Sequence, residues 1–238
     1  MQFGIKPSTK HRQEIFLRQQ RFINDVSHEL RTPLTVIRGW VDILESYGTK
    51  DPELFREAVA SIKNSAQNMQ SLVENLLFLS RAERGHQSLT KLPVDLDELL
   101  KKFVEERCSP RVQISKLTPC KILADAEFMK KMFAAFVDNA LTYSPPEMPV
   151  KIELTTKNSF ATLKFIDRGI GIEKADCQKI FDSFYRTDKS RTKILNDKSS
   201  VGLGLTVAKW IADCHDIKIS VNSKIGEGST FALTIPTI

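Results

Sequence analysis

Apolar residues in the first third of the chain recur at alternating spacings of three and four, as they do in helices that pack against other helices. The first run predicts a helix over residues 10–46, and the second predicts a helix over residues 52–84 that Asp51 caps and Pro52 begins. The apolar positions are Ile23, Val26, Leu30, Leu34, Ile37, Val41 and Leu44 in the first helix, and Phe55, Val59, Ile62, Ala66, Met69, Val73, Leu76 and Leu79 or Ser80 in the second. One hairpin cannot bury stripes this wide, so we expect two hairpins to form a dimeric four-helix bundle.

The periodicity of the chain changes after residues 85–94, which we interpret as a linker. Helices are expected from a capping-box-like start at Asp95, over residues 125–143 with Asp125 as N-cap, and over residues 203–214. Between them, apolar and polar residues alternate as in half-buried strands, around residues 150–154, 161–165, 217–221 and 231–235. This order predicts an α/β sandwich, a mixed sheet with helices on one face.

The fold class expected for the whole chain is therefore α + α/β, a helical hairpin followed by a sandwich. The corresponding domains are a leading segment 1–14, a dimerisation domain 15–84, the linker 85–94 and an α/β domain 95–238.

Composition restricts the function more than it identifies it. The 238 residues are 41% hydrophobic and 27% charged, with a net charge of +6, as in a soluble globular protein. No apolar run approaches the roughly 20 residues that span a bilayer, so we expect a cytoplasmic chain. Basic clusters interleaved with aromatic residues are missing, which disfavours nucleic acid as a partner. The four cysteines form no C-x-x-C pair, which disfavours a zinc site or a disulfide framework.

The first candidate for chemistry is the string Ser27-His28-Glu29-Leu30-Arg31-Thr32-Pro33-Leu34. At about 100° per residue, His28 falls on the far side of the helix from Ile23, and Thr32 lies one turn further on the same exposed face. Glu29 is the immediate neighbour of the imidazole. A solvated helix face with an incidental histidine would explain His28 alone, but not a nucleophile, a carboxylate and a hydroxyl in one long motif.

The second half of the chain holds polar groups at the ends of predicted elements. Asn139 and Tyr143 stand at i and i+4, so a metal-ligating amide oxygen and a ring that can pack on a purine project together, although a helix end with a core tyrosine is an alternative. Asp167 continues the inward positions of a strand, and Gly169 and Gly171 allow a close approach of the backbone, although a plain turn would also explain them.

Glycines also open the last predicted helix. Gly202-Leu203-Gly204 would direct free backbone N–H groups toward a phosphate. An aromatic segment with Phe184 and Arg186 precedes a polar stretch over residues 187–201, which we interpret as a mobile lid. A disordered loop is the alternative, and the two interpretations are compatible. Ser229 follows two glycines, Gly226 and Gly228, near the end of the chain.

The order of these motifs resembles the ATP-binding domain that histidine kinases share with gyrase-type ATPases and related chaperones. The string around His28 resembles the phosphoacceptor box of two-component sensor histidine kinases, and the likeness extends over about residues 15–237. The resemblance implies an ATP- and Mg²⁺-dependent protein histidine kinase that forms a homodimer and passes phosphate to an aspartate of a response regulator receiver domain. It also implies a parent protein anchored in the cell membrane through a segment outside this chain.

The same resemblance assigns roles to matching residues. His28 would be the phosphoacceptor, Glu29 the general base, and Thr32 would orient water when the domain dephosphorylates its regulator. Asn139 would ligate Mg²⁺ and Asp167 would bind the adenine amino group. The other residues of the nucleotide pocket would be Tyr143, Gly169, Gly171, Phe184, Arg186, Gly202, Leu203, Gly204 and Ser229.

Three positions depart from the family pattern. Ala135 stands where many relatives have a second asparagine, Thr142 where many have a cation, and Ser199-Ser200-Val201 where the lid has further glycines. Each departure removes a phosphate contact or freedom of the lid, so we expect weak ATP binding or slow autophosphorylation. An alternative is a dimeric regulator-binding and phosphatase module for which ATP is a conformational ligand.

Overall fold

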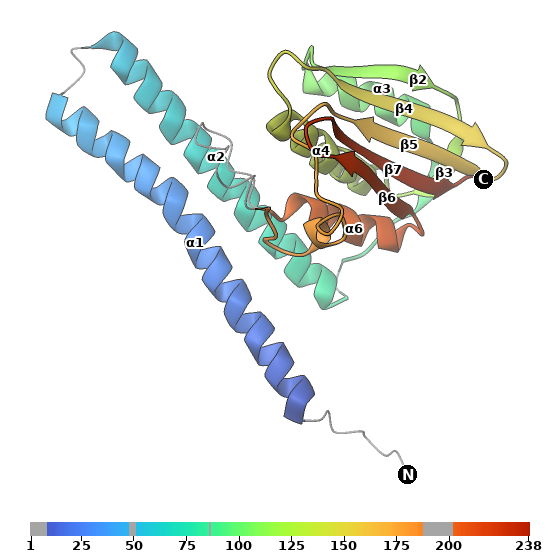
Figure 1. Ribbon diagram of the computed structural model, residues 1–238, viewed down its shortest axis with the longest axis horizontal. Helices are drawn as coiled ribbons and strands as arrows, with labels where there is room; N and C mark the ends of the chain where they lie inside the picture. Colours follow the sequence, from blue (N-terminus) through green and yellow to red (C-terminus); the bar gives the residue numbers. More distant parts are fainter. Residues whose placement is uncertain (1–8, 48–50, 86, 188–201) are drawn as a thin grey trace. The chain divides into compact units, whose positions relative to one another are not determined.

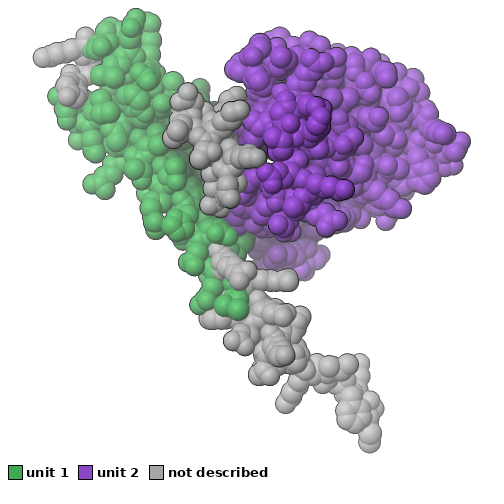
Figure 2. All heavy atoms as spheres, viewed as in Figure 1, with its two compact units in different colours: residues 1–73 green, residues 74–238 purple. Residues whose placement is uncertain are grey.

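The computed structural model describes residues 9–47, 51–85, 87–187 and 202–238. The chain divides into two compact units, residues 1–73 and 74–238, which Figure 2 distinguishes by colour.

Two long helices that run in opposite directions account for the described part of the first unit (Figure 1). Helix α1 spans Thr9–Tyr47 and α2 spans Pro52–Glu83, so only residues 48–51 separate them. The Asp51 carboxylate accepts hydrogen bonds from the backbone N–H groups of Glu53 at 2.9 Å and Leu54 at 3.2 Å, which is the expected N-cap. The expected pair of long helices is confirmed.

A mixed five-stranded sheet forms the second unit. Its strand order is β2-β4-β5-β7-β6, in which β2 and β4 are parallel and the other neighbours antiparallel. The strands are β2 (Val112–Leu117), β4 (Val150–Lys157), β5 (Phe160–Ile166), β6 (Lys218–Lys224) and β7 (Gly228–Pro236). Buried and half-exposed residues alternate along β5 and β7, so one face of the sheet carries the core.

A second, two-stranded sheet corrects two expectations about the start of this unit. Strand β1 (Leu92–Asp95) pairs antiparallel with β3 (Lys121–Ala124), so residues 92–94 lie in a strand and not in a linker. Asp95 makes no side-chain cap for the helix that follows. Its carboxylate instead lies 3.5 Å from the ammonium group of Lys121 on the paired strand, since the ladder places these two residues opposite each other.

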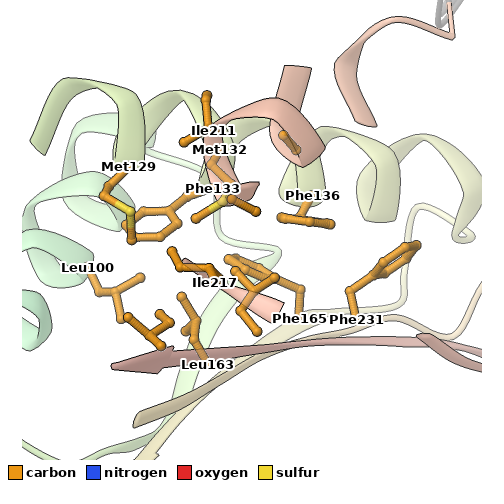
Figure 3. Packing of buried hydrophobic residues seen from close by; sticks show 14 of the residues in the cluster. Leu100, Met129, Met132, Phe133, Phe136, Leu163, Phe165, Ile211, Ile217 and Phe231 are labelled. Atoms are coloured by element: carbon orange, nitrogen blue, oxygen red, sulfur yellow. The ribbon is translucent and has the colours of Figure 1, made fainter. Parts of the chain in front are cut away.

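Helices α3 (Leu96–Arg107), α4 (Ala126–Tyr143) and α6 (Gly204–Cys214) cover one face of the sheet, and η1 (Lys179–Phe181) is a short 3₁₀ turn (Figure 1). Phe133 and Phe136 of α4 point at Phe165 of β5 and Phe231 of β7 (Figure 3). The Phe136 ring centroid lies 5.2 Å from that of Phe165 and 5.3 Å from that of Phe231. Each such ring contributes about 1.5–3 kcal/mol by leaving water, so this cluster fixes α4 on the sheet. The predicted mixed α/β fold is confirmed.

The last turns of α2 belong to the second unit. The buried Phe78 ring packs edge-on against Phe128 of α4 at 5.6 Å and against Trp210 of α6 at 5.1 Å. The Lys131 ammonium group lies 4.3 Å from the Phe78 ring centroid, within the range of a cation–π interaction. These contacts explain why the compact units divide at residues 73 and 74, inside α2. The domain limits 15–84 and 95–238 stay predictions.

A buried histidine joins the two helices that flank the site described below. His215, 5% exposed at the end of α6, accepts a hydrogen bond at Nε2 from the backbone N–H of Asp125, 3.0 Å away. Its Nδ1 lies 2.8 Å from the carbonyl oxygen of Ile211, so the neutral ring with its proton on Nδ1 satisfies both contacts. The Asp125 carboxylate caps α4 and also accepts from the backbone N–H of Thr90 at 3.1 Å.

Burial lowers the pKa of His215, and Lys91 lowers it further, against the opposing effects of the Ile211 carbonyl, Asp125 and Asp216. The folded state therefore favours the neutral ring. Its contribution to the free energy of unfolding is complete above the unfolded pKa of about 6.5 and is lost as the pH falls below that value.

We expect the melting temperature to fall as the pH is lowered from about 7.5 to 5.5. It should fall less in His215→Gln, whose amide oxygen can still accept a hydrogen bond from the Asp125 N–H. Thermal unfolding followed by circular dichroism measures both. Equal pH slopes in the two proteins would show that another group controls the acid sensitivity.

Candidate functional site

Asp167 lies directly after β5 and is, among the described residues of the second unit, the most buried carboxylate, at 6% exposure. Its Oδ1 accepts hydrogen bonds from the backbone N–H of Gly169 at 2.8 Å and of Ser229 at 3.2 Å. Burial raises the pKa of Asp167, and these two N–H groups oppose the rise. Within the described part of the chain no hydrogen bond reaches Oδ2, so this oxygen can accept a hydrogen bond from an amino group of a ligand.

Two glycines allow the β6–β7 hairpin to close on the Asp167 loop. Gly171 has φ +72°, and a Cβ there would collide with the carbonyl oxygen of Lys224. Gly228 has φ +106°, and a Cβ there would collide with the carbonyl oxygen of Asp167. Only glycine combines these backbone angles with these contacts. The backbones of the hairpin and the loop thus lie directly against each other, with no room for a side chain at these two positions.

Two serines, Ser223 and Ser229, add hydrogen bonds to the contact between the hairpin and the loop, and Ser223 was not predicted from the sequence. The Ser223 hydroxyl accepts from the backbone N–H of Ile172 at 2.8 Å and donates to the carbonyl of Gly228 at 2.9 Å. Its oxygen also lies 2.9 Å from that of Ser229, the predicted residue. The strand pattern held a signal for Ser223, because it continues the inward positions of Ile219 and Val221.

The face of α4 that holds Asn139 and Tyr143 lies between this loop and the start of α6. The Tyr143 carbonyl accepts a hydrogen bond from the backbone N–H of Ile170 at 3.2 Å. Two turns earlier on that face, the Ala135 methyl lies 3.8 Å from the place of a Cβ on Gly204. Since these three positions are spaced by four residues, the half-buried Asn139 stands between the two glycine-rich segments.

The start of α6 offers backbone donors for an anion. Leu203 occupies its N-cap and has no side-chain oxygen, so it cannot satisfy the first N–H groups of the helix. The carbonyl of Gly202, a residue with φ +73°, accepts a hydrogen bond from the backbone N–H of Phe184 at 3.1 Å. This bond places the aromatic segment beside the start of α6. Arg186 is half-buried, and its Nε is buried without a hydrogen-bond partner. Residues 188–201, which include most of the predicted lid and Ser199-Ser200-Val201, lie outside the described residues.

The residues that surround Asp167 fit an adenine nucleotide with Mg²⁺. Oδ2 can accept a hydrogen bond from a purine amino group, and the N–H groups at the start of α6 can donate to phosphate oxygens. Among the described residues no group of three His, Cys, Asp or Glu side chains could hold a metal ion. A lone amide ligand such as Asn139 suits Mg²⁺, which keeps waters and phosphate oxygens as its other ligands.

The histidine of the first unit is accessible. His28 and Thr32 are exposed and Glu29 is half-exposed on α1, which continues through Pro33. The Thr32 hydroxyl donates to the carbonyl oxygen of His28 at 3.4 Å. An imidazole, a neighbouring carboxylate and a hydroxyl are therefore presented on one helix.

Two family models match this arrangement. The His Kinase A (phospho-acceptor) domain matches residues 18–85, and the histidine kinase-, DNA gyrase B- and HSP90-like ATPase matches residues 124–238. The chain thus joins a phosphoacceptor hairpin to an ATPase domain. It belongs to the two-component sensor histidine kinases.

Individual relatives agree with this assignment. The sensor histidine kinase YkoH of Bacillus subtilis is 34% identical over 92% of this chain and 48% of its own length. The signal transduction histidine-protein kinase ArlS of Staphylococcus epidermidis is 31% identical over 95% of this chain and 50% of its own length. The histidine kinase AdeS of Acinetobacter baumannii has a similar structure, with a TM-score of 0.64 at 26% identity over 88% of this chain and 97% of that one.

The chain thus spans about half the length of the first two relatives, 48% and 50%. In the described ranges, no helix combines the length and the hydropathy needed to cross a membrane.

The hairpin closure can be tested with two alanine variants of one loop. Gly228→Ala should lower the free energy of unfolding by about 2–3 kcal/mol and weaken adenine nucleotide binding, because its methyl meets the Asp167 backbone. Gly226→Ala is the matched control. Its φ of +79° is equally left-handed but its Cβ would meet nothing within 4 Å, so about 1 kcal/mol is expected. Equal losses in urea unfolding would mean that backbone angle alone requires these glycines.

Proposed function

We propose that this chain is the catalytic portion of an ATP-dependent protein histidine kinase that phosphorylates its own His28 and passes the phosphoryl group to an aspartate of a response regulator. The observation that carries the proposal is the presence in one chain of an exposed His28, next to Glu29, and of a site around Asp167 whose donors and acceptors suit a nucleotide.

The site would hold the nucleotide by contacts of known chemistry. Asp167 Oδ2 accepts from the adenine amino group, and the Tyr143 ring lines the base. The N–H groups at the start of α6 bind phosphate, and Arg186 adds a cation. Asn139 would hold Mg²⁺, which neutralises the charge that develops on the phosphates. Gly169, Gly171 and Ser229 shape the pocket around these groups.

The transfer step uses residues of α1. Glu29 takes the proton from one ring nitrogen of His28 as the other nitrogen attacks the γ-phosphorus, so an N–P bond forms and the bond to the ADP oxygen breaks. A receiver carboxylate then attacks the same phosphorus and frees the imidazole. Thr32 is proposed to orient water when the domain removes phosphate from that carboxylate.

Exposed apolar residues support a homodimer. On α1, Ile23 is 61% and Leu34 is 56% exposed, and on α2, Val59 is 45% exposed. These residues belong to the stripes that predicted a bundle, and single solvent-exposed side chains at such regular spacing favour a partner helix pair. A second copy of this chain would cover them in a four-helix bundle.

A second candidate is a regulator-binding and phosphatase module for which ATP is a conformational ligand. The position of Ala135 favours it, since its methyl group lies 3.8 Å from the place of a Cβ on Gly204, at the start of α6, where an amide could have coordinated. Thr142, two turns after Ala135 on α4, supplies no cation.

Labelled ATP separates the two candidates. With γ-labelled ATP and Mg²⁺, we expect acid-labile label on the wild-type chain and none on His28→Gln or Asn139→Ala. Thr32→Ala should keep the label and lose regulator dephosphorylation. A wild-type chain without label, whose dephosphorylation of the regulator depends on Thr32, would support the second candidate instead.

Restoring the missing amide tests whether the Ala135 departure limits the reaction. Ala135→Asn should raise the rate of label incorporation about tenfold, because it adds a ligand one turn before Asn139 beside Gly204. Ala175→Asn, at an exposed turn, is the control for the added amide. An unchanged rate in Ala135→Asn would show that this departure does not limit phosphoryl transfer.

A further inference from the structure

The guanidinium group of Arg111 lies among the carbonyl oxygens at the end of α4. Its Nη1 donates to Leu141 at 3.4 Å, and its Nη2 donates to Ser144 at 3.3 Å and to Pro145 at 2.7 Å. Nε and Nη2 both donate to Met148, each at 3.2 Å. One side chain thus binds four backbone carbonyls in the last turn of the helix and in the loop that follows.

These carbonyls need a cation from elsewhere in the chain. The last C=O groups of a helix have no partner within it and carry the negative end of its dipole. The last turn of α4 contains no basic residue, and its C-cap Ser144 supplies only a backbone N–H to Ala140. Arg111 provides both the missing donors and the positive charge.

The backbone of Arg111 is itself fixed. It directly precedes β2, and its carbonyl accepts from the backbone N–H of Val150 at 2.7 Å, where β4 begins. Val112 and Val150 then pair in the parallel ladder. The guanidinium therefore extends from the edge of the sheet, and not from a free loop.

The end of α4 that Arg111 holds is a wall of the candidate site. Tyr143 lies between Leu141 and Ser144, and its own carbonyl accepts from the Ile170 N–H at 3.2 Å. That carbonyl is also the atom that a Cβ on Gly169 would meet. Gly169 in turn donates to Asp167 Oδ1 at 2.8 Å. A shift of the last turn of α4 would therefore displace Gly169, which contacts it, and with Gly169 the hydrogen bond to the Asp167 carboxylate.

We propose that Arg111 is a positioning residue for nucleotide binding, which holds the end of α4 so that Tyr143 and the Asp167 loop keep the geometry of the base pocket. It acts through backbone carbonyls and does not touch the nucleotide. This inference rests on the proposed function, since it assumes that the Asp167 site binds an adenine nucleotide.

Three variants test the role. Arg111→Met keeps most of the apolar stem and removes the donors, so it should weaken binding of Mg²⁺–ADP about tenfold in calorimetry well below its melting temperature. Arg111→Lys should recover only part of the loss, because one ammonium cannot reach carbonyls on several sides. Lys130→Met is the matched control. It removes a cation near the other end of α4, where Lys130 pairs with Glu106 at 3.5 Å and Glu127 at 3.6 Å, and should bind as the wild type does.

Amide hydrogen exchange, measured without nucleotide, distinguishes positioning from general stability. In Arg111→Met we expect faster exchange at residues 140–144 and 169–171, with β5 and β7 still protected. Wild-type affinity in Arg111→Met, or faster exchange over the whole sheet, would overturn the proposal. A wild-type chain that binds no ADP would refute the proposed function, while the exchange pattern would still decide whether Arg111 orders the α4 end.

Discussion

The candidate site depends on how the buried Asp167 carboxylate is solvated. Taking this charge out of water is unfavourable, and the raised pKa of Asp167 records that cost. Two backbone N–H groups from segments far apart in sequence, at Gly169 and Ser229, replace part of the lost water. The loop and the β6–β7 hairpin must therefore meet at Asp167, and the glycines that permit close approach, Gly171 and Gly228, follow from that requirement.

Helix α4 connects this polar site to the apolar core. One of its faces supplies Phe133 and Phe136 to the aromatic cluster on the sheet, as Figure 3 shows. Its polar side carries Asn139, and its last residue, Tyr143, meets the Asp167 loop. Because the core is closely packed, the helix has little freedom to shift, and its functional groups stay where the packing places them.

The N-terminal end of α4 and the C-terminal end of α6 hold neighbouring segments in place, whereas the opposite ends of these helices flank the candidate site. His215 and Asp125 join the two helices there, Asp125 holds Thr90, and Phe78 of α2 packs between Phe128 and Trp210. The end of α2 is thus attached to the same two helices whose other ends flank the candidate site. The packing of Phe78 and the candidate site lie at opposite ends of one helix pair.

Periodicity and local motifs in the sequence were enough to determine the two long helices, the four alternating strands, the helices that begin at Asp125 and near Gly204, and the site candidates from Asn139 to Ser229. Each of these depends on residues close together in the chain, whose spacing alone fixes the element and the side that a residue occupies. The roles proposed for these residues are those that the resemblance to the family implies.

Tertiary structure decided the features that depend on distant partners. Features that join segments well separated in sequence are the β1–β3 sheet, the ion pair that Asp95 makes instead of a helix cap, the hydrogen bond between Ser223 and Ile172, and the approach of Ala135 to the start of α6. Arg111 is the clearest case. Nothing near it in the sequence indicates that its guanidinium would bind the end of a helix about thirty residues later, since only the closed fold brings those carbonyls to it.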